Sequence, residues 1–217
     1  MRLLRIDSSI RTDGSVSRAV ADTAEAAWRR EAPAAEVVRR DLGSNPLPPL
    51  WAAAAIARAV PPDVRSPEQR DGLALAAELV DELLAADALL VTAPHYNFGV
   101  PQQIKHWIDL VICEPRADDV SVPLLPGRPA LVVGTRGGGY APGTPREGWD
   151  HATPYLERIL GDVWGLEVST IAAELTAATY NPAMAHLADA AAAELVAAHR
   201  AAEDLMIAAA HRCRRAA

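Results

Sequence analysis

The sequence lacks several features that mark common classes of protein. Its 217 residues include only two cysteines, Cys113 and Cys213, which lie far apart and outside any Cys-x-x-Cys motif. A disulfide scaffold and a structural zinc site are therefore not expected. No apolar run approaches the ~20 residues that a membrane span needs, and the first residues lead into a strand, unlike a signal peptide. We expect a cytoplasmic protein with no membrane partner.

Basic residues are also scarce. The 21 Lys and Arg residues are outnumbered by 28 Asp and Glu residues, the formal net charge is -7, and Lys105 is the only lysine. Proteins that bind nucleic acid usually carry a basic excess, so no nucleic-acid partner is expected. His95, His106 and His151 have no spacing that suggests metal ligands, and no metal site is expected either.

Short apolar runs alternate with amphipathic stretches along the chain. The apolar runs predict strands at residues 3–6, 36–42, 88–93, 128–134 and 166–173. The amphipathic stretches predict helices at residues 16–30, 67–86, 101–112, 153–160 and from 181 to the C-terminus. This order is typical of a single α/β domain spanning residues 1–217: a flavodoxin-like, three-layer, doubly wound parallel sheet of five strands in the order 2-1-3-4-5.

Capping signals predict where individual helices begin. Ser66 precedes Pro67 and has Gln69 three residues later, which is the pattern of a capping box. Thr153 before Pro154 is interpreted as another cap, and Asn181 before a proline as the start of the last helix. The proline-rich stretch at residues 45–67 is predicted to be a loop or lid that contains a short helix.

In a doubly wound sheet the ligand lies beyond the carboxyl ends of the strands. The loop after the first strand carries Ser9 and leads to Ser15, Val16 and Ser17 at the start of a helix. Hydroxyl groups and the free N–H groups of a helix start are suited to a phosphate monoester. The loop lacks the Walker A and GxGxxG patterns, which disfavours a nucleoside triphosphate or a Rossmann-bound dinucleotide. Ser15 or Ser17 as an ordinary helix cap is the alternative.

The loops after the third and fourth strands add a surface for a flat ligand. The third loop holds His95, Tyr96, Asn97 and Phe98 between two prolines, and Phe98 is the only phenylalanine of the chain. Core packing and ligand contact both remain open for its rings. The fourth loop consists of Thr135, Arg136, Gly137 and Gly138, whose glycines permit close approach of the backbone to a ligand or, alternatively, a flexible turn.

Taken in order, these segments closely resemble the FMN-dependent NADH azoreductases, also described as NADH:quinone oxidoreductases. The resemblance extends over nearly the whole chain, and its most specific part is the Tyr96-Asn97-Phe98 loop with the following Gln102, Lys105 and Asp109. Two positions depart from the family pattern. His95 stands where a methionine is common, and Thr135 where a serine is common.

The resemblance implies a tightly but non-covalently bound FMN, NADH or NADPH as co-substrate, and a homodimer with two active sites at the subunit interface. It further implies a ping-pong reduction of quinones and aromatic azo compounds in which no side chain is an obligate acid or base. The implied roles are phosphate binding by Ser9, Ser15, Val16 and Ser17, contact with the flavin ring and ribityl chain by His95, Tyr96, Asn97 and Phe98, and contact with the pyrimidine edge of the flavin by Thr135, Arg136, Gly137 and Gly138.

Other functions are compatible with the same loops. A flavodoxin-type electron carrier would bind FMN without a substrate of its own. An NADPH-dependent FMN reductase, or a quinone reductase that prefers NADPH, would use a similar site. A non-catalytic protein that uses the scaffold for interaction is the third alternative. Trp51, Tyr140 and Trp149, predicted in loops, are candidates for the wall of a substrate pocket.

Overall fold

A parallel five-stranded sheet forms the centre of the protein in a computed structural model that describes residues 1–216. The strand order is β2-β1-β3-β4-β5, and every neighbouring pair is parallel. The predicted fold class and strand order are therefore confirmed. The strands are β1 (Arg2–Asp7), β2 (Glu36–Asp41), β3 (Ala88–Pro94), β4 (Pro129–Thr135) and β5 (Glu167–Ala173).

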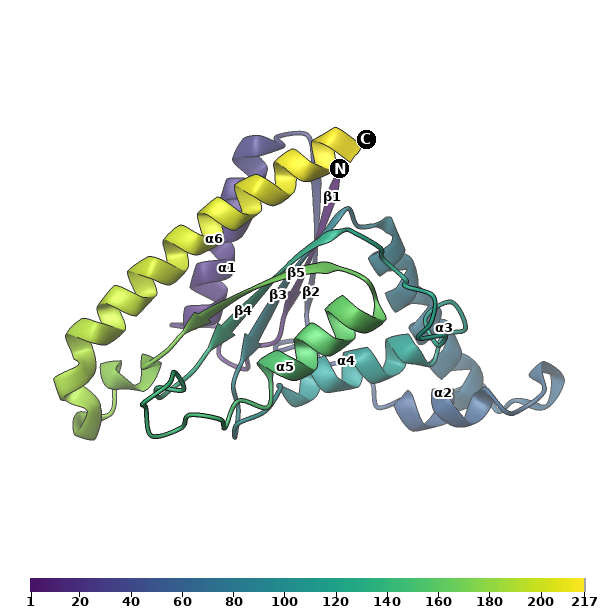
Figure 1. Cartoon of the computed structure of the whole chain (residues 1–217). Helices are drawn as coiled ribbons and strands as arrows, with labels where there is room; N and C mark the ends of the chain where they lie inside the picture. The colour runs from purple at the N-terminus through teal and green to yellow at the C-terminus, as the bar shows by residue number, and fades with distance from the viewer. Residues whose placement is uncertain (217) are drawn as a thin grey trace.

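Helices cover both faces of the sheet (Figure 1). One face is covered by α1 (Val16–Glu31) and α6 (Ala188–Ala216), which pack side by side. The other is covered by α2 (Trp51–Ala57), α3 (Pro67–Ala85), α4 (Gln102–Ile112) and α5 (Thr153–Leu156). None of the helices in residues 1–216 has the length and apolar character of a membrane span.

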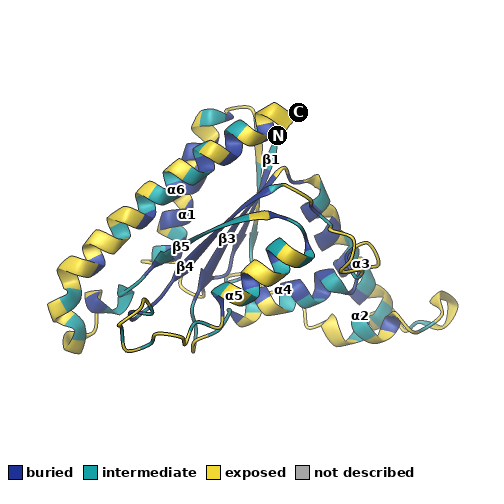
Figure 2. Ribbon diagram, in the orientation of Figure 1, coloured by how far each residue is buried: buried dark blue, intermediate teal, exposed yellow. Residues whose placement is uncertain are grey.

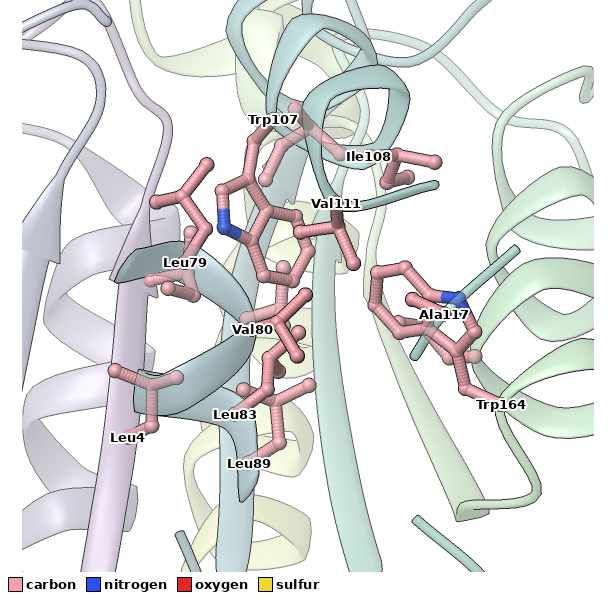
Figure 3. Packing of buried hydrophobic residues seen from close by; sticks show 14 of the residues in the cluster. Leu4, Leu79, Val80, Leu83, Leu89, Trp107, Ile108, Val111, Ala117 and Trp164 are labelled. Atoms are coloured by element: carbon pink, nitrogen blue, oxygen red, sulfur yellow. The ribbon is translucent and has the colours of Figure 1, made fainter. Parts of the chain in front are cut away.

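Two apolar clusters hold these layers together. All residues of β3 and β4 are buried, as expected for central strands with helices on both faces, whereas the outer side of α6 is exposed (Figure 2). On the α3 and α4 face, the rings of Trp107 and Trp164 meet edge to face with centroids 5.4 Å apart. Figure 3 shows them with Leu79, Leu83 and Leu89. The close-packed centre leaves the loops at the strand ends as the place for a ligand.

The structure corrects two predicted helix starts. Thr153 is the first residue of α5 and not its cap; after Leu156 the chain continues as a π-helical segment, Glu157–Val163. The side chain of Asn181 caps a short 3₁₀ helix, Pro182–Leu187, so α6 begins only at Ala188. The capping box at Ser66 is present as predicted. At α5 the N–H groups of Ala152 and Thr153 donate to Asp150, three residues before Thr153, and before α6 the helix begins as a 3₁₀ turn.

Candidate functional site

Two neighbouring cavities lie at the carboxyl edge of the sheet and share His95 and Tyr96. The smaller has a volume of about 260 Å³ and the larger about 1000 Å³. Among the predicted site residues, the smaller cavity is lined by Ser9, Ser15, Val16, Ser17, His95, Tyr96, Thr135 and Gly137. Asn97 lines the larger cavity, whereas Phe98, Arg136 and Gly138 line neither.

Three serine hydroxyls gather where β1 leads into α1. Ser15 Oγ lies 2.9 Å from Ser9 Oγ and 3.3 Å from Ser17 Oγ. Ser15 is the N-cap of α1, and the first N–H groups of a helix have no partner within the helix. This group of hydroxyls and N–H donors at a helix N-terminus, which we call the serine cradle (Ser9, Ser15 and Ser17), is suited to an anion such as a phosphate.

Arg18 holds the loop of the serine cradle through hydrogen bonds to its backbone. Its Nη2 donates to the carbonyl oxygen of Ser9 at 2.8 Å, and its Nε donates to the carbonyl oxygen of Arg11 at 3.1 Å. The guanidinium also pairs with Asp41 at the end of β2, at 2.7 Å. Hydrogen bonding to Arg18 lowers the pKa of Asp41 to about 2, against the opposing effect of burial. Arg18 thus fixes the loop through an ion pair that was not predicted from the sequence.

Residues 95–98 form a tight turn that we call the 95–98 turn. The Gly99 N–H donates to the Tyr96 carbonyl oxygen at 3.2 Å, and Asn97 and Phe98 have φ angles of 51° and 71°. Positive φ is uncommon outside glycine and is costly for a bulky residue such as phenylalanine. The ring of Phe98 meets Trp149 edge to face at 5.3 Å. The surrounding contacts therefore hold a conformation that the sequence alone disfavours.

His95 departs from its neighbours because its ring points into the protein. The side chain is 2 % exposed, and Nε2 lies 2.8 Å from Oδ1 of Asp150. Burial lowers the pKa of His95 despite the opposing effect of Asp150, so the ring is neutral at pH 7. His95 therefore presents its backbone, and not its ring, to the two cavities.

The glycine loop after β4 is held by the segment that follows β5. The carbonyl oxygens of Gly137 and Gly138 accept from the N–H groups of Ala177 and Leu175, at 3.1 and 3.4 Å. Within residues 1–216, the N–H groups of Gly137 and Gly138 have no acceptor of their own. Gly137 lines the smaller cavity and so brings a free donor to it, and Gly138 carries a second free donor at the next position of the loop. A side chain at Gly138 would meet the guanidinium of Arg146, so substitution there perturbs Arg146 before it reaches the cavity.

The guanidinium of Arg136 is held by protein side chains. Its Nη1 pairs with Oε1 of Glu174 at 2.7 Å, and its Nη2 donates to Thr153 Oγ1 at 2.9 Å and to Asp150. The side chain is 10 % exposed. Arg136 therefore ties the glycine loop to the segment after β5 and to the start of α5.

Sequence reasoning missed the part of the site that follows β5. Thr176, Thr179 and Tyr180 line the smaller cavity, together with Arg11 from the loop after β1. The guanidinium carbon of Arg11 lies 6.0 Å from the ring centroid of Tyr180. Arg11 adds a positive charge beside the serine cradle. The sequence carries one signal for this part of the site, which is an arginine, Arg11, in a loop rich in hydroxyl residues. The residues after β5 carry none.

The arrangement suits binding of a phosphorylated, flat ligand. No group of three or more metal-ligating side chains occurs in the described part of the chain. Burial raises the pKa of the Cys113 thiol, which makes it a poor nucleophile. Anion donors lie at one end of the cavities, and aromatic side chains, Tyr96 and Trp51, lie along the larger one.

Comparison with known proteins decides the family. A family model described as a flavodoxin-like fold matches residues 1–199. The FMN-dependent NADH:quinone oxidoreductase of Streptomyces avermitilis is 42% identical over 198 residues, which cover 91% of this chain and 91% of that protein. The enzyme of the same name from Kineococcus radiotolerans is 42% identical over 210 residues, covering 94% of this chain and 97% of that protein. The chain belongs to this family. As an FMN-dependent NADH:quinone oxidoreductase family member, it matches its relatives over almost their whole length, so the family resemblance expected from the loops is confirmed.

Solved structures support the fold. An azoreductase from Bacillus anthracis str. Sterne superposes with a TM-score of 0.77 at 19% identity and covers 95% of this chain and 99% of its own. An FMN-dependent NADH-azoreductase from Bacillus anthracis str. Ames Ancestor, solved in complex with FMN, superposes with a TM-score of 0.72 at 19% identity, covering 93% of this chain and 100% of its own. At this identity the likeness shows the shared flavodoxin-like fold.

Proposed function

We propose that this protein is an FMN-dependent oxidoreductase that takes two electrons from NADH or NADPH and passes them to quinones or aromatic azo compounds in a ping-pong cycle. The observation that carries the proposal is the meeting of the serine cradle, the 95–98 turn and the glycine loop around two joined cavities. Family membership supports the same activity. The NADH requirement of the relatives, in turn, supports a cytoplasmic location, where this co-substrate is available.

The residues at the smaller cavity fit the phosphate of FMN. Hydroxyl groups from Ser9, Ser15 and Ser17 and the N–H groups of Val16 and Ser17 would donate to its oxygen atoms. The guanidinium of Arg11 would add a cation beside them. The dianionic character of a phosphate monoester near pH 7 matches this set of donors.

The rest of the binding site follows from the chain order. Residues 95–98 would lie along the flavin ring and ribityl chain, and residues 135–138 along the pyrimidine edge. When bound, FMN supplies the hydride chemistry. The free N–H groups of Gly137 and Gly138 would donate to the edge that gains negative charge on reduction, which is stabilisation by fixed backbone dipoles. We propose no side chain as an obligate acid or base.

The larger cavity would receive the nicotinamide and then the acceptor. It is lined on one side by Tyr96 and on another by Trp51, whose side chain is 47% exposed. Flat, aromatic walls suit quinones and azo dyes and give little basis for rejecting one flat acceptor in favour of another. Trp149 contacts Phe98 instead of this cavity, and Tyr140 packs against His95.

We also propose a homodimer formed at this edge. Large apolar side chains at this edge are exposed: Ile10 and Tyr180, which line the cavities, by 61% and 66%, and Trp149, which packs on Phe98, by 52%. A second copy would cover them and supply a further wall to each site. Size-exclusion chromatography with light scattering should give a molar mass of twice the 23.1 kDa of one chain. A monomer at micromolar concentration would contradict the dimer and leave the FMN proposal standing.

The visible spectrum of the purified protein tests the main proposal. We expect a yellow protein whose flavin absorption is bleached by NADH under anaerobic conditions and restored by added benzoquinone. Bleaching without recovery by quinone, but with reduction of free FMN, would indicate an FMN reductase. A flavin that NADH does not reduce would indicate an electron carrier. Protein that stays colourless after incubation with FMN would overturn the proposal.

A further inference from the structure

Asp150 joins three segments of the site through one carboxylate. Its Oδ1 accepts from His95 Nε2 at 2.8 Å, and from the N–H groups of Ala152 and Thr153 at 2.9 Å each. Its Oδ2 accepts from Arg136. The carboxylate thus connects the 95–98 turn, the glycine loop and the start of α5.

These bonds fix the charge of the pair. Burial raises the pKa of Asp150, but the hydrogen bonds from Thr153, His95 and Ala152 outweigh it and hold the pKa far below its ordinary value. Asp150 is therefore ionised. Because His95 is neutral at pH 7, its single ring proton lies on Nε2, where it is donated to Asp150.

The other ring nitrogen of His95, Nδ1, lies in a site that disfavours protonation. Nδ1 is buried and has no hydrogen-bond partner in the described residues. The charged groups near the ring are Asp150, from the segment before α5, and Arg136, from the loop after β4; Glu174, after β5, pairs with Arg136. The Tyr140 ring packs against the imidazole with centroids 5.8 Å apart. A second ring proton, on Nδ1, would place a positive charge in a buried position close to Arg136, and the backbone of Thr135 and the carboxylate of Asp150 offset that cost only in part.

We propose that His95 and Asp150 are a positioning pair, in which the neutral ring anchors the backbone of the 95–98 turn for FMN and protonation of the ring releases that anchor and weakens FMN binding. The inference rests on the proposed FMN site. The pair does not touch the reacting atoms, since the His95 ring is buried away from both cavities and only the backbone of this residue faces them.

FMN affinity measured against pH tests the pair. Apoprotein would be titrated with FMN between pH 5 and 8, with flavin fluorescence quenching as the signal, for the wild type, H95Q and H95M. Glutamine retains an N–H donor for Asp150 but cannot be protonated, and methionine removes both properties. The FMN phosphate itself titrates near pH 6 in every variant, so the quantity of interest is the ratio of the wild-type dissociation constant to that of each variant.

We expect the ratio of the wild-type dissociation constant to that of H95Q to lie near one at pH 8 and to rise toward pH 5, by at most about tenfold per pH unit, which is the limit for uptake of one proton. H95M should bind FMN more weakly than H95Q at pH 8 and should also lack the His95 contribution at acid pH. A control substitution of an exposed histidine far along the chain, H186Q, should keep the wild-type dependence.

Parallel curves for the wild type and H95Q would overturn the positioning pair. Circular dichroism of each apoprotein separates loss of the fold from loss of the anchor. If the wild type binds no FMN at any pH, the proposed function fails; if it binds FMN with the same pH dependence as H95Q, only this inference fails.

Discussion

Replacing Gly43 with alanine tests whether backbone packing under the serine cradle sets its shape. Gly43 follows β2 and lies against Ser9. A Cβ atom at this position would be 2.0 Å from the carbonyl oxygen of Ser9 and 2.9 Å from Nη2 of Arg18. Since Cβ atoms essentially never come within 3.0 Å of another heavy atom, the two segments must separate by about 1 Å. That carbonyl oxygen is the one that Arg18 holds.

The expected cost follows from this overlap. Extra atoms in a well-packed site typically cost about 1–3 kcal/mol of folding free energy, which for a chain of this size corresponds to a fall in Tm of roughly 2–12 °C. Movement of Ser9 would also remove one charge-assisted hydrogen bond to the FMN phosphate. We therefore expect the FMN dissociation constant to rise by about tenfold or more.

The assay is differential scanning fluorimetry of the apoprotein together with fluorescence titration of FMN. Gly161→Ala is the matched control, because a Cβ atom there would make only an ordinary contact with Val168 at 3.7 Å. It should bind FMN like the wild type. A G43A protein with wild-type melting temperature and wild-type FMN affinity would refute the argument that Ser9 is held by close backbone packing.

Three further predictions concern stability. The hydrogen bond with Arg18 lowers the pKa of the Asp41 carboxyl to about 2. The ion pair therefore adds to the free energy of unfolding above the ordinary pKa near 4, and this addition is lost as the pH falls toward 2. In urea unfolding measured from pH 5 to 2, D41N should remove up to about 2 kcal/mol of this pH dependence. W164A should cost about 3–5 kcal/mol, because the buried ring packs against Trp107, and a smaller loss in denaturant melts would contradict this packing. S66A should cost about 1 kcal/mol through loss of the α3 cap, and an unchanged urea midpoint would argue against the capping box.

The sheet was predictable because its signals are local. The apolar runs that became β3 and β4 are buried at every residue, which is what an uninterrupted run in a parallel sheet predicts. Helix starts were harder. Thr153 is a residue type that often caps helices. In the structure, however, the N–H groups of Ala152 and Thr153 donate to Asp150, so the carboxylate of Asp150 caps this helix start in its place.

The site was predictable only where it follows a strand whose position was known. The serine cradle and the glycine loop follow β1 and β4 directly, and the fold rule places such loops at one edge. By contrast, Thr176 and Tyr180 reach the smaller cavity from a segment with no sequence motif. The family resemblance placed Arg136 beside the ligand, but it could not predict that its guanidinium pairs with Glu174, a residue 38 positions further along the chain.

The dependence of the glycine loop on the segment after β5 also has a consequence for synthesis of the chain. Gly137 and Gly138 are hydrogen-bonded to residues 177 and 175, and Arg136 is paired with Glu174. β5 is the last strand of the sheet, so a nascent chain that has emerged only as far as β4 has the serine cradle but lacks Asp150 and Trp149, which hold the 95–98 turn, and the residues after β5, which hold the glycine loop. Contacts between distant parts of a chain form late in folding. If the proposed flavin site needs all three loops, we expect cofactor uptake to follow addition of β5 to the sheet edge.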